Sequence, residues 1–309
     1  MFTIVGSGFG LYGYLPAILQ ELGDKVILPE EYLSKVRSRR ELKELEKDIF
    51  WVKNKELAIK KATKVIFTVP PNYQYKAVKN LFNDNGRNNV QTIFLEKPVA
   101  TSPIKSIELL ELLESKEVDY VIGYSFLYLD LDSNFNTLVN SSAQISWQWS
   151  FMAHHFSMDL KNWKRYHSSG GGVLRFYGIH IIAFLSKFGY DNVEESTLIC
   201  QHFDEPFIWN AKFIGENLPP CNVTVNCKLK KDIFNISSEN VDNSILLNDP
   251  FSLLVDRFDG LDKRVPMLAS LLKNEMLDKR NRNQIYKNIN SLWKIVENVS
   301  IWRLKKINT

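Results

Sequence analysis

The chain has 309 residues, of which 45% are hydrophobic and 24% are charged, and its formal net charge is +4 at pH 7. This length predicts about two domains, and the composition is that of a globular protein. The basic excess lies in short runs without interleaved aromatic residues, so we expect no nucleic-acid partner.

The cysteines and the first residues predict a cytoplasmic protein. Cys200, Cys221 and Cys227 form no CxxC pair, and their odd number fits a reducing compartment. The opening MFTIVGSGFG has no basic segment, and glycines break its apolar run, so no signal peptide is expected. No apolar run approaches the roughly 18 residues that a membrane-spanning helix needs, so we expect no membrane association.

Strand and helix patterns alternate through the first part of the chain. Short apolar runs predict strands at residues 2–6, 25–29, 64–71, 91–98 and 118–125. Helical patterns separate them in YLPAILQELG, YQYKAVKNLFND and residues 103–116. The charged stretch LKELEKDIFWVKNKELAIKKA has helical patterns around a possible short strand. This alternation predicts an α/β fold, with a parallel-sheet Rossmann domain over residues 1–122.

The pattern changes after Tyr124. Residues 143–151 are strand-like, and GVLRFYGIHIIAFLSKFG predicts a helix that is buried on most faces. Short alternating runs then follow, which are ESTLICQHF, FIWNAKFIG, CNVTVNCKL and DIFNISSE, and NQIYKNINSLWKIVENVSIW predicts a closing helix. We therefore expect a second, α+β domain over residues 123–309, with a mostly antiparallel open sheet.

A glycine-rich turn follows the first predicted strand, in IVGSGFGLYGYLPA. Gly6 is placed for the tight turn, and Gly8 lets the backbone approach a pyrophosphate at the start of the next helix. Leu11 stands where the GxGxxG fingerprint requires glycine or alanine, so the strand–turn–helix–strand context carries the prediction. This context predicts a dinucleotide cofactor.

The residues after the second strand leave the choice between NAD and NADP open. Glu30 is placed to accept hydrogen bonds from a ribose diol, which favours NAD(H). Arg37, Arg39 and Arg40 follow closely enough to serve a 2′-phosphate instead.

Four stretches in order resemble the glucose–fructose oxidoreductase/inositol dehydrogenase family (Gfo/Idh/MocA). They are VGSGFGLYGYLPA, FTVPPNYQ, EKPVATS and NWKRYHSSGGGVLRFYGIHIIAFLSKFG, and together they reach to about residue 190. The resemblance implies a nicotinamide held between a Rossmann domain and an α+β domain. It also implies a homodimer or higher homo-oligomer formed through the C-terminal sheet.

The resemblance also implies roles for individual residues. Lys97 corresponds to the EKP lysine and is expected to polarise a carbonyl or alkoxide oxygen, while His180 is the candidate proton donor or acceptor. The expected cofactor-binding residues are Gly6, Gly8, Phe9, Gly10, Glu30, Val69, Pro70, Pro71, Gln74, Glu96 and Lys97. Further candidates for proton donation or substrate contact are Tyr124, Trp163, Lys164, Tyr166 and Tyr177.

The chain also departs from the family pattern at several positions. Phe176 replaces an aspartate that many members carry four residues before the histidine, and Ala183 replaces a second aspartate. Gln74, Leu127 and Lys164 replace a histidine and two arginines. The Lys–Asp–His apparatus of the sugar dehydrogenases is therefore incomplete.

The expected function is NAD(P)-dependent hydride transfer to or from a carbohydrate or nucleotide-sugar ketone or hydroxyl group. Two alternatives remain: an imine or conjugated-system reductase of the same fold, or a non-catalytic dinucleotide-binding regulatory or scaffold subunit. Both hypotheses that make the protein an oxidoreductase predict a small, sugar-like or conjugated substrate that lies near Lys97 and His180.

Two local patterns complete the predictions. His154 and His155 are adjacent on an expected strand and would point to opposite faces, so no metal site is expected. Trp147, Trp149 and Phe151 have the period-2 spacing of one sheet face. The triplet Gly170–Gly172 is expected to let the backbone pass close to substrate and cofactor.

Overall fold

The computed structural model describes residues 1–83, 89–238, 241–273 and 279–305. The chain divides into two compact units, with Met1–Ala100, Glu108–Tyr128 and Leu254–Arg282 in the first and Thr101–Ile107, Leu129–Leu253 and Asn283–Thr309 in the second. The division by sequence at residues 122/123 differs from this one, because Leu254–Arg282 returns to the first unit. Among the described residues, no helix is long and apolar enough to span a membrane.

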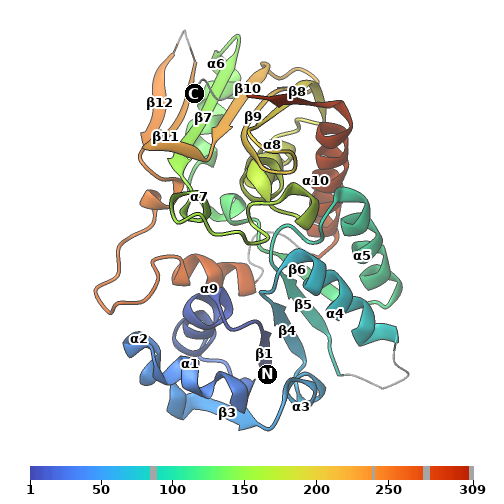
Figure 1. Ribbon diagram of the computed structural model, residues 1–309, viewed down its shortest axis with the longest axis vertical. Helices are drawn as coiled ribbons and strands as arrows, with labels where there is room; N and C mark the ends of the chain where they lie inside the picture. The colour runs from blue at the N-terminus through green and yellow to red at the C-terminus, as the bar shows by residue number, and fades with distance from the viewer. Residues whose placement is uncertain (84–88, 239–240, 274–278, 306–309) are drawn as a thin grey trace. The chain divides into compact units, whose positions relative to one another are not determined.

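The first unit contains a parallel sheet whose strands among the described residues run in the order β3-β2-β1-β4-β5-β6 (Figure 1). This order is that of a doubly wound Rossmann sheet, as the alternating pattern predicted. Phe2 on β1 pairs with Val26 on one side and Lys64 on the other, so the first strand lies at the centre. The strands are β1 (Phe2–Val5), β2 (Val26–Pro29), β3 (Ile49–Val52), β4 (Lys64–Phe67), β5 (Thr92–Leu95) and β6 (Asp119–Ile122).

The helix after β1 consists of two π-helical segments rather than one α-helix. Leu15 and Pro16 lie between them and keep helical backbone angles, so the chain remains helical from one segment to the next. The helical segments up to residue 128 are η1 (Gly10–Tyr14), η2 (Ala17–Leu22), η3 (Glu30–Tyr32), α1 (Leu33–Arg37), α2 (Arg40–Lys43), η4 (Glu46–Asp48), α3 (Lys55–Lys61), α4 (Pro71–Asn83), α5 (Pro103–Ser115) and η5 (Ser125–Tyr128).

The returning segment contributes a helix, α9 (Val265–Lys273), that the sequence analysis did not predict. It packs against η1, η2 and η5 of the first unit. Its buried side chains are Val265, Met267, Leu268, Ala269, Leu271 and Leu272. A segment close to the C-terminus therefore supports the helix that follows the glycine turn.

The second unit is built on a mixed sheet with the order β12-β11-β7-β10-β9-β8-β13 among the described residues. The β7–β10 and β8–β13 pairs are parallel and the other pairs are antiparallel, so the sheet is mostly antiparallel as predicted. The strands are β7 (Ile145–Met152), β8 (Asn192–Cys200), β9 (Pro206–Ile214), β10 (Cys221–Asn226), β11 (Lys228–Ser238), β12 (Val241–Leu247) and β13 (Ser300–Leu304).

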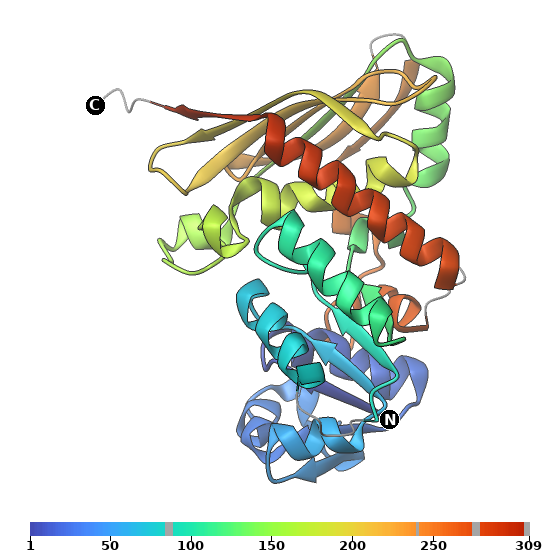
Figure 2. The same cartoon turned by 90° about the vertical axis from the view of Figure 1, so that its right-hand side faces the viewer.

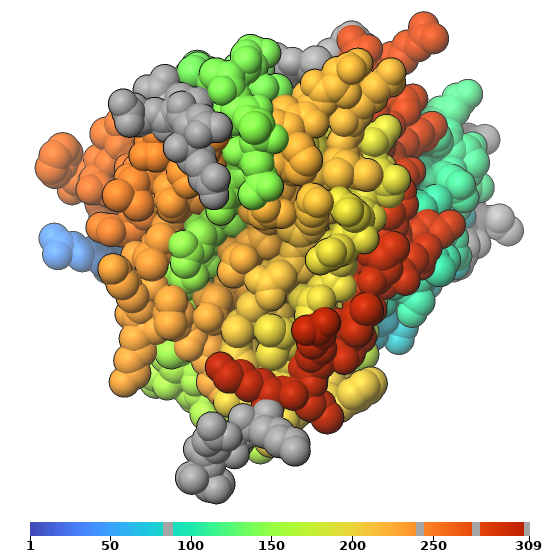
Figure 3. Space-filling model, turned by 90° about the horizontal axis from the view of Figure 1, so that it is seen from above, coloured from blue at the N-terminus to red at the C-terminus, as the bar shows by residue number. Residues whose placement is uncertain are grey.

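Helices lie on one face of this sheet, where Figure 2 shows α8 and α10 on the same side. Trp147 and Trp149 both point to that side, as their spacing predicted, and the Trp147 ring lies 5.3 Å from the ring of Phe184 on α8. Figure 3 looks onto the other face, where strands of the sheet lie at the surface. The helical segments from residue 129 to the C-terminus, other than α9, are α6 (Asp132–Ser141), α7 (His154–Ser157), η6 (His167–Ser169), η7 (Val173–Gly178), α8 (Ile179–Lys187), η8 (Pro250–Leu253) and α10 (Lys279–Val299).

Two local predictions were wrong. The closing helix was expected to continue through Trp302, but it ends at Val299, and Ser300–Leu304 pairs with β8 as an edge strand. The Ser300 hydroxyl bonds that of Ser196, and the Ile301–Trp302 pair favours a strand at this edge. The strand β7 ends at Met152, so His154 and His155 lie on the short helix α7 rather than on a strand.

Candidate functional site

A pocket of about 510 Å³ lies at the glycine turn of the first unit. Its lining is Val5, Gly6, Ser7, Gly8, Glu31, Tyr32, Lys35, Lys55, Thr68, Val69 and Pro70. These residues follow the carboxyl ends of β1, β2, β3 and β4, which is where doubly wound sheets bind their ligands. Four of the predicted cofactor residues line this pocket: Gly6, Gly8, Val69 and Pro70. Glu30 does not line it, and its neighbour Glu31 does.

The three glycines of the turn differ in the space that surrounds them. Gly6 has a φ of +126°, and a Cβ there would lie 2.4 Å from Thr68 Oγ1, so only glycine fits. A Cβ on Gly10 would lie 2.6 Å from Ile4 Cγ2, which makes Gly10 the site of close helix–strand packing. A Cβ on Gly8 would meet nothing within 4 Å, so its backbone faces the open space of the pocket.

The charges at the pocket differ from those expected at this position. Glu30 lines a separate depression with Arg37, whose guanidinium is paired with Glu46 at 2.7 Å. Glu31 lines the pocket, and its carboxylate is paired with Lys55 at 2.8 Å.

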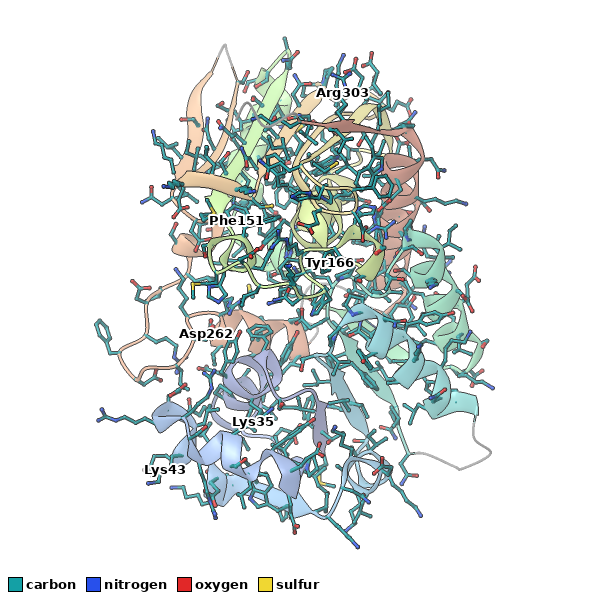
Figure 4. The ribbon with its side chains drawn as sticks, in the orientation of Figure 1. Lys35, Lys43, Phe151, Tyr166, Asp262 and Arg303 are labelled. Atoms are coloured by element: carbon teal, nitrogen blue, oxygen red, sulfur yellow. The ribbon has the colours of Figure 1, made fainter. Side chains whose placement is uncertain are left out.

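A second lysine adds positive charge at the same pocket. The Lys35 ammonium donates a hydrogen bond to the Ser7 hydroxyl in the glycine turn, and Figure 4 labels Lys35 on α1. Lys35 and Lys55 belong to no recognised motif, so the sequence analysis did not predict a role for either. Their place at the pocket is seen only in the folded chain.

The loop that carries Lys97 is held by Gln74. The Gln74 side chain is fully buried, and its amide nitrogen donates to the carbonyls of Glu96 at 2.8 Å and Val99 at 2.9 Å. Its oxygen accepts the Glu96 backbone N–H at 3.1 Å. Both the nitrogen and the oxygen of the Gln74 amide are therefore hydrogen-bonded to backbone, and the side chain fixes the backbone on both sides of Lys97.

The Glu96 carboxylate lies beneath the same loop and accepts a hydrogen bond from the Tyr14 hydroxyl at 2.6 Å. Burial raises the pKa of Glu96, and this is opposed by the Tyr14 hydrogen bond and by the charges of Lys97 and Arg264. The Arg264 guanidinium lies 4.4 Å from the centre of the Phe9 ring. Phe9, in the glycine turn, therefore packs against Arg264, and Glu96, in the lysine loop, is hydrogen-bonded to Tyr14. Both contacts lie within the first unit and help to order these two segments.

In the second unit, the glycine triplet folds the preceding loop onto itself. A Cβ on Gly171 would lie 2.1 Å from the Trp163 carbonyl oxygen, and Gly172 has a φ of +71°. The Gly172 N–H donates to the Lys164 carbonyl at 2.8 Å, and the Gly171 N–H to the Tyr166 carbonyl at 2.9 Å. The observed task of the triplet is thus to hold the backbone of residues 163–166 in place.

This loop sets an aromatic cluster beside the helix that carries His180. The Phe176 ring meets the Trp163 ring edge-on at 5.3 Å and the Tyr177 ring at 4.7 Å. The Lys164 ammonium lies over Phe176, 5.2 Å from the ring centre. The backbone at Gly178 and Ile179 is helical, so η7 continues into α8 and Phe176 lies one helical turn before the buried His180.

Arg175, to which the sequence analysis assigned no role, forms hydrogen bonds to three separate segments of the second unit. Its guanidinium binds both carboxylate oxygens of Glu297 on α10, at 2.7 and 2.9 Å, and donates to the carbonyls of Thr101 and His167. Glu297 also accepts bonds from the His167 ring and from the Trp293 indole. Burial alone would raise the pKa of Glu297, but the bonds from His167 and Arg175 hold it at about 2.

No protein-family model and no curated protein sequence matches the chain. Among solved structures it is similar to KijD10, a 3-ketoreductase from Actinomadura kijaniata in complex with NADP and TDP-benzene, with 12% identity, a TM-score of 0.70 and 99% of each chain covered. It is also similar to an oxidoreductase from Thermotoga maritima, with 17% identity, a TM-score of 0.66, and 96% of this chain and 95% of that chain covered. The chain shares their fold.

The candidate tyrosines lie in different surroundings. Tyr124 is fully buried just after β6 of the first unit. Tyr166, which Figure 4 labels, is half-buried in the glycine-triplet loop of the second unit. Tyr177 packs against the Phe151 ring at 4.7 Å, and burial raises the pKa of its phenol well above the ordinary value. Tyr177 is therefore a neutral hydroxyl at physiological pH, close to the helix of His180.

His155 gives the second unit a testable pH dependence. Burial, together with the charges of Lys164, Arg165 and His154, lowers the pKa of His155 to about 4. The unfolded chain protonates this histidine near pH 6.5, so between pH 6.5 and 4 the unfolded state binds a proton that the native state does not. Stability therefore falls as the pH falls through this window, by up to about 3 kcal/mol.

We expect His155→Phe to remove this part of the pH dependence. Denaturant unfolding at pH 7.0 and pH 4.5 measures it in both proteins. An equal loss of stability in the wild type and the variant would assign the titration to other groups.

Proposed function

We propose that this protein is an NADP(H)-dependent oxidoreductase of the Gfo/Idh/MocA type. The pocket at the glycine turn carries the proposal, because its shape and charge suit a phosphorylated dinucleotide. Gly8 leaves room for a pyrophosphate to approach the backbone, and Gly6 and Gly10 shape the turn by close packing. KijD10, which has the same fold, was crystallised with NADP.

The pocket charges favour NADP over NAD. A ribose diol is usually bound by a carboxylate, but the Glu31 carboxylate is already paired with Lys55. The Lys35 ammonium provides a positive charge for a 2′-phosphate beside the Ser7 hydroxyl. The cofactor that we propose therefore differs from the NAD(H) that Glu30 favoured on sequence alone.

The bound nicotinamide would supply or accept the hydride, and the protein would orient the substrate and handle the proton. Lys97, on a loop fixed by Gln74, would stabilise negative charge on the reacting oxygen. His180 on α8 would give or take the proton. The substrate class that we propose is a carbohydrate or nucleotide-sugar derivative reacting at a hydroxyl or ketone, and KijD10 is a 3-ketoreductase crystallised with TDP-benzene. Through its open sheet face we propose a homo-oligomer.

The cofactor preference is tested by titrating the full chain with NADPH and with NADH. We expect NADPH to bind at least about tenfold more tightly, measured by the fluorescence of the bound nicotinamide. Absence of binding by either nucleotide would overturn the proposed function. Equal binding of both would overturn only the preference for NADP.

Lys35→Glu tests the pocket assignment. It should weaken NADPH binding by roughly 10- to 100-fold, the size of one lost charge-assisted hydrogen bond, with a much smaller effect on NADH. Lys43→Glu is the matched control, because Lys43 is an exposed lysine on the next helix, α2, and does not line the pocket. Figure 4 labels both lysines. If the two variants lose NADPH affinity equally, the effect is one of overall charge and the assignment of Lys35 fails.

A further inference from the structure

A buried tyrosine joins the end of β2 to the glycine turn. Tyr32, the last residue of η3, is only 4% exposed, and its hydroxyl oxygen accepts a hydrogen bond from the backbone N–H of Gly6 at 2.9 Å. Tyr32 also lines the pocket at the turn, together with Gly6 and Gly8. The sequence analysis assigned Tyr32 no role, because a local pattern does not show a partner 26 residues away in the chain.

This hydrogen bond changes which donor the turn offers to a ligand. In dinucleotide-binding turns of this type, backbone N–H groups face the pyrophosphate. Here the Gly6 N–H is already donated to Tyr32. A phenol oxygen that accepts one hydrogen bond still carries a proton of its own to donate. Among the residues that the structure describes, none accepts the Tyr32 proton.

Other polar side chains of the pocket are directed to other partners. The Glu31 carboxylate is paired with Lys55 at 2.8 Å, so it does not take the phenol proton. The Thr68 hydroxyl donates to the carbonyl of Gly6 at 3.3 Å. The hydroxyl of Tyr32 therefore has a proton that a ligand in the pocket can receive.

The surroundings of Tyr32 keep its phenol neutral. Burial raises the pKa of Tyr32 and the charge of Glu31 acts in the same direction, while the Gly6 hydrogen bond and the charge of Lys55 oppose the shift. The Lys55 ammonium lies 5.9 Å from the centre of the Tyr32 ring, within the range of a cation–π interaction. A phenol with a raised pKa keeps its proton at physiological pH, so it acts as a donor and does not repel a phosphate.

We propose that Tyr32 is a cofactor-binding residue whose hydroxyl, held by the Gly6 N–H, donates its proton to a pyrophosphate oxygen of the bound nucleotide. This inference rests on the proposed function and adds to it a contact made by a side chain from the end of β2. NADPH and NADH carry the same pyrophosphate, so the contact strengthens the binding of both. Lys35 differs from Tyr32 in this respect, because the 2′-phosphate beside it belongs to NADPH alone.

Tyr32→Phe removes the hydroxyl and keeps the ring. We expect it to weaken binding of NADPH and of NADH by roughly 10- to 100-fold, the size of one hydrogen bond to a charged group. The ratio of the two affinities should change by less than about threefold. Titrations of the full chain, followed by nicotinamide fluorescence, measure both. Unchanged affinity for the two nucleotides would overturn the proposal, and so would a loss confined to NADPH.

Two fragments of the cofactor separate a direct contact from a distorted turn. ADP carries the diphosphate, whereas adenosine 2′-monophosphate carries only the phosphate that is proposed to lie beside Lys35 and Ser7. In calorimetric titrations, Tyr32→Phe should weaken ADP binding by roughly 10- to 100-fold and change adenosine 2′-monophosphate binding by less than about threefold. A distorted turn would move Ser7 as well and weaken both fragments, so equal losses would overturn the proposal.

Tyr120→Phe is the matched control. Tyr120 is also a buried tyrosine of the first unit, its hydroxyl donates to Glu114 at 2.8 Å, and it does not line the pocket. This variant should lower the temperature of thermal unfolding, as Tyr32→Phe does, and leave nucleotide affinity unchanged. Equal losses of nucleotide affinity in the two variants would assign the effect to stability and overturn the role of Tyr32.

The wild type provides a test that does not depend on the folding of a variant. A crystal structure of the full chain with bound ADP should place the Tyr32 hydroxyl within about 3.2 Å of a diphosphate oxygen, and a longer distance would overturn the proposal. A wild type that binds neither NADPH nor NADH would overturn the proposed function and this inference with it. The other outcomes concern Tyr32 alone, so the two failures are distinguishable.

Discussion

Replacing Arg175 by methionine is expected to lower the free energy of unfolding by about 3–5 kcal/mol, the range for removal of one partner from a buried ion pair. The side chains of Arg175 and Glu297 are only 12% and 14% exposed. Without the guanidinium, the Glu297 carboxylate keeps only the His167 ring and the Trp293 indole as partners among those described above. Chemical denaturation monitored by tryptophan fluorescence at pH 7 measures the loss.

The double variant Arg175→Met with Glu297→Gln is the control for this explanation. Glutamine carries no charge, so the buried site no longer holds an uncompensated carboxylate, and we expect at least half of the lost stability to return. If the double variant is no more stable than Arg175→Met alone, the loss comes from packing rather than from the unpaired charge. A loss below about 1 kcal/mol in the single variant would contradict the buried-pair argument altogether.

The role of this pair extends beyond stability, because of the elements that it joins. Arg175 belongs to η7, which continues into the helix of His180, and its guanidinium also holds the carbonyl of Thr101, four residues after Lys97 in the chain. Glu297 ties the same guanidinium to α10. One buried ion pair therefore orders the helix of the proposed proton donor and the segment that follows the lysine loop.

The architecture was predicted correctly where a run with strand or helix periodicity is bounded by turn residues in the sequence. The five strands of the first half with strong apolar runs and the alternating runs of the second sheet all formed. The short helix α9 was missed because a nine-residue apolar run is too brief for its period to distinguish a helix from a loop. The strand Ser300–Leu304 was not predicted because it forms by pairing with the edge of β8. A local sequence pattern carries no information about such a distant partner.

The candidate site was predictable where the backbone conformation restricts which residue type can occupy a position. Gly6 has a positive φ that glycine alone adopts easily, so the turn was recognisable from the sequence. Lys35, Arg175 and Glu297 were not predictable in the same way. Their importance comes from partners far along the chain, such as Glu297 for Arg175, and an isolated charge in a sequence does not show its partner. Gln74 was expected to touch the cofactor, yet its amide bonds the backbone beside Lys97.

Gly8→Val should separate nucleotide binding from folding more sharply than any other change in the turn. A Cβ at Gly8 meets nothing within 4 Å, and the backbone there does not have the positive φ of Gly6, so we expect stability to change by no more than about 0.5 kcal/mol. The new side chain would project into the pocket and keep a pyrophosphate from the backbone. NADPH affinity should therefore fall by more than about 100-fold, or about 2.7 kcal/mol.

Gly6→Ala is the contrasting variant. Its Cβ would lie 2.4 Å from Thr68 Oγ1 and 2.6 Å from the Thr68 carbonyl oxygen at a φ of +126°, so it should lose stability as well as binding. Thermal unfolding and NADPH titration on both variants give the two readouts. If Gly8→Val binds NADPH as the wild type does, the glycine turn is not where the nucleotide binds, whatever the stability of the variant. Gly6 and Gly8 belong to the same motif, but a Cβ would clash with Thr68 at Gly6 and would meet nothing within 4 Å at Gly8. Comparing the two variants therefore separates a loss of nucleotide binding from a loss of stability.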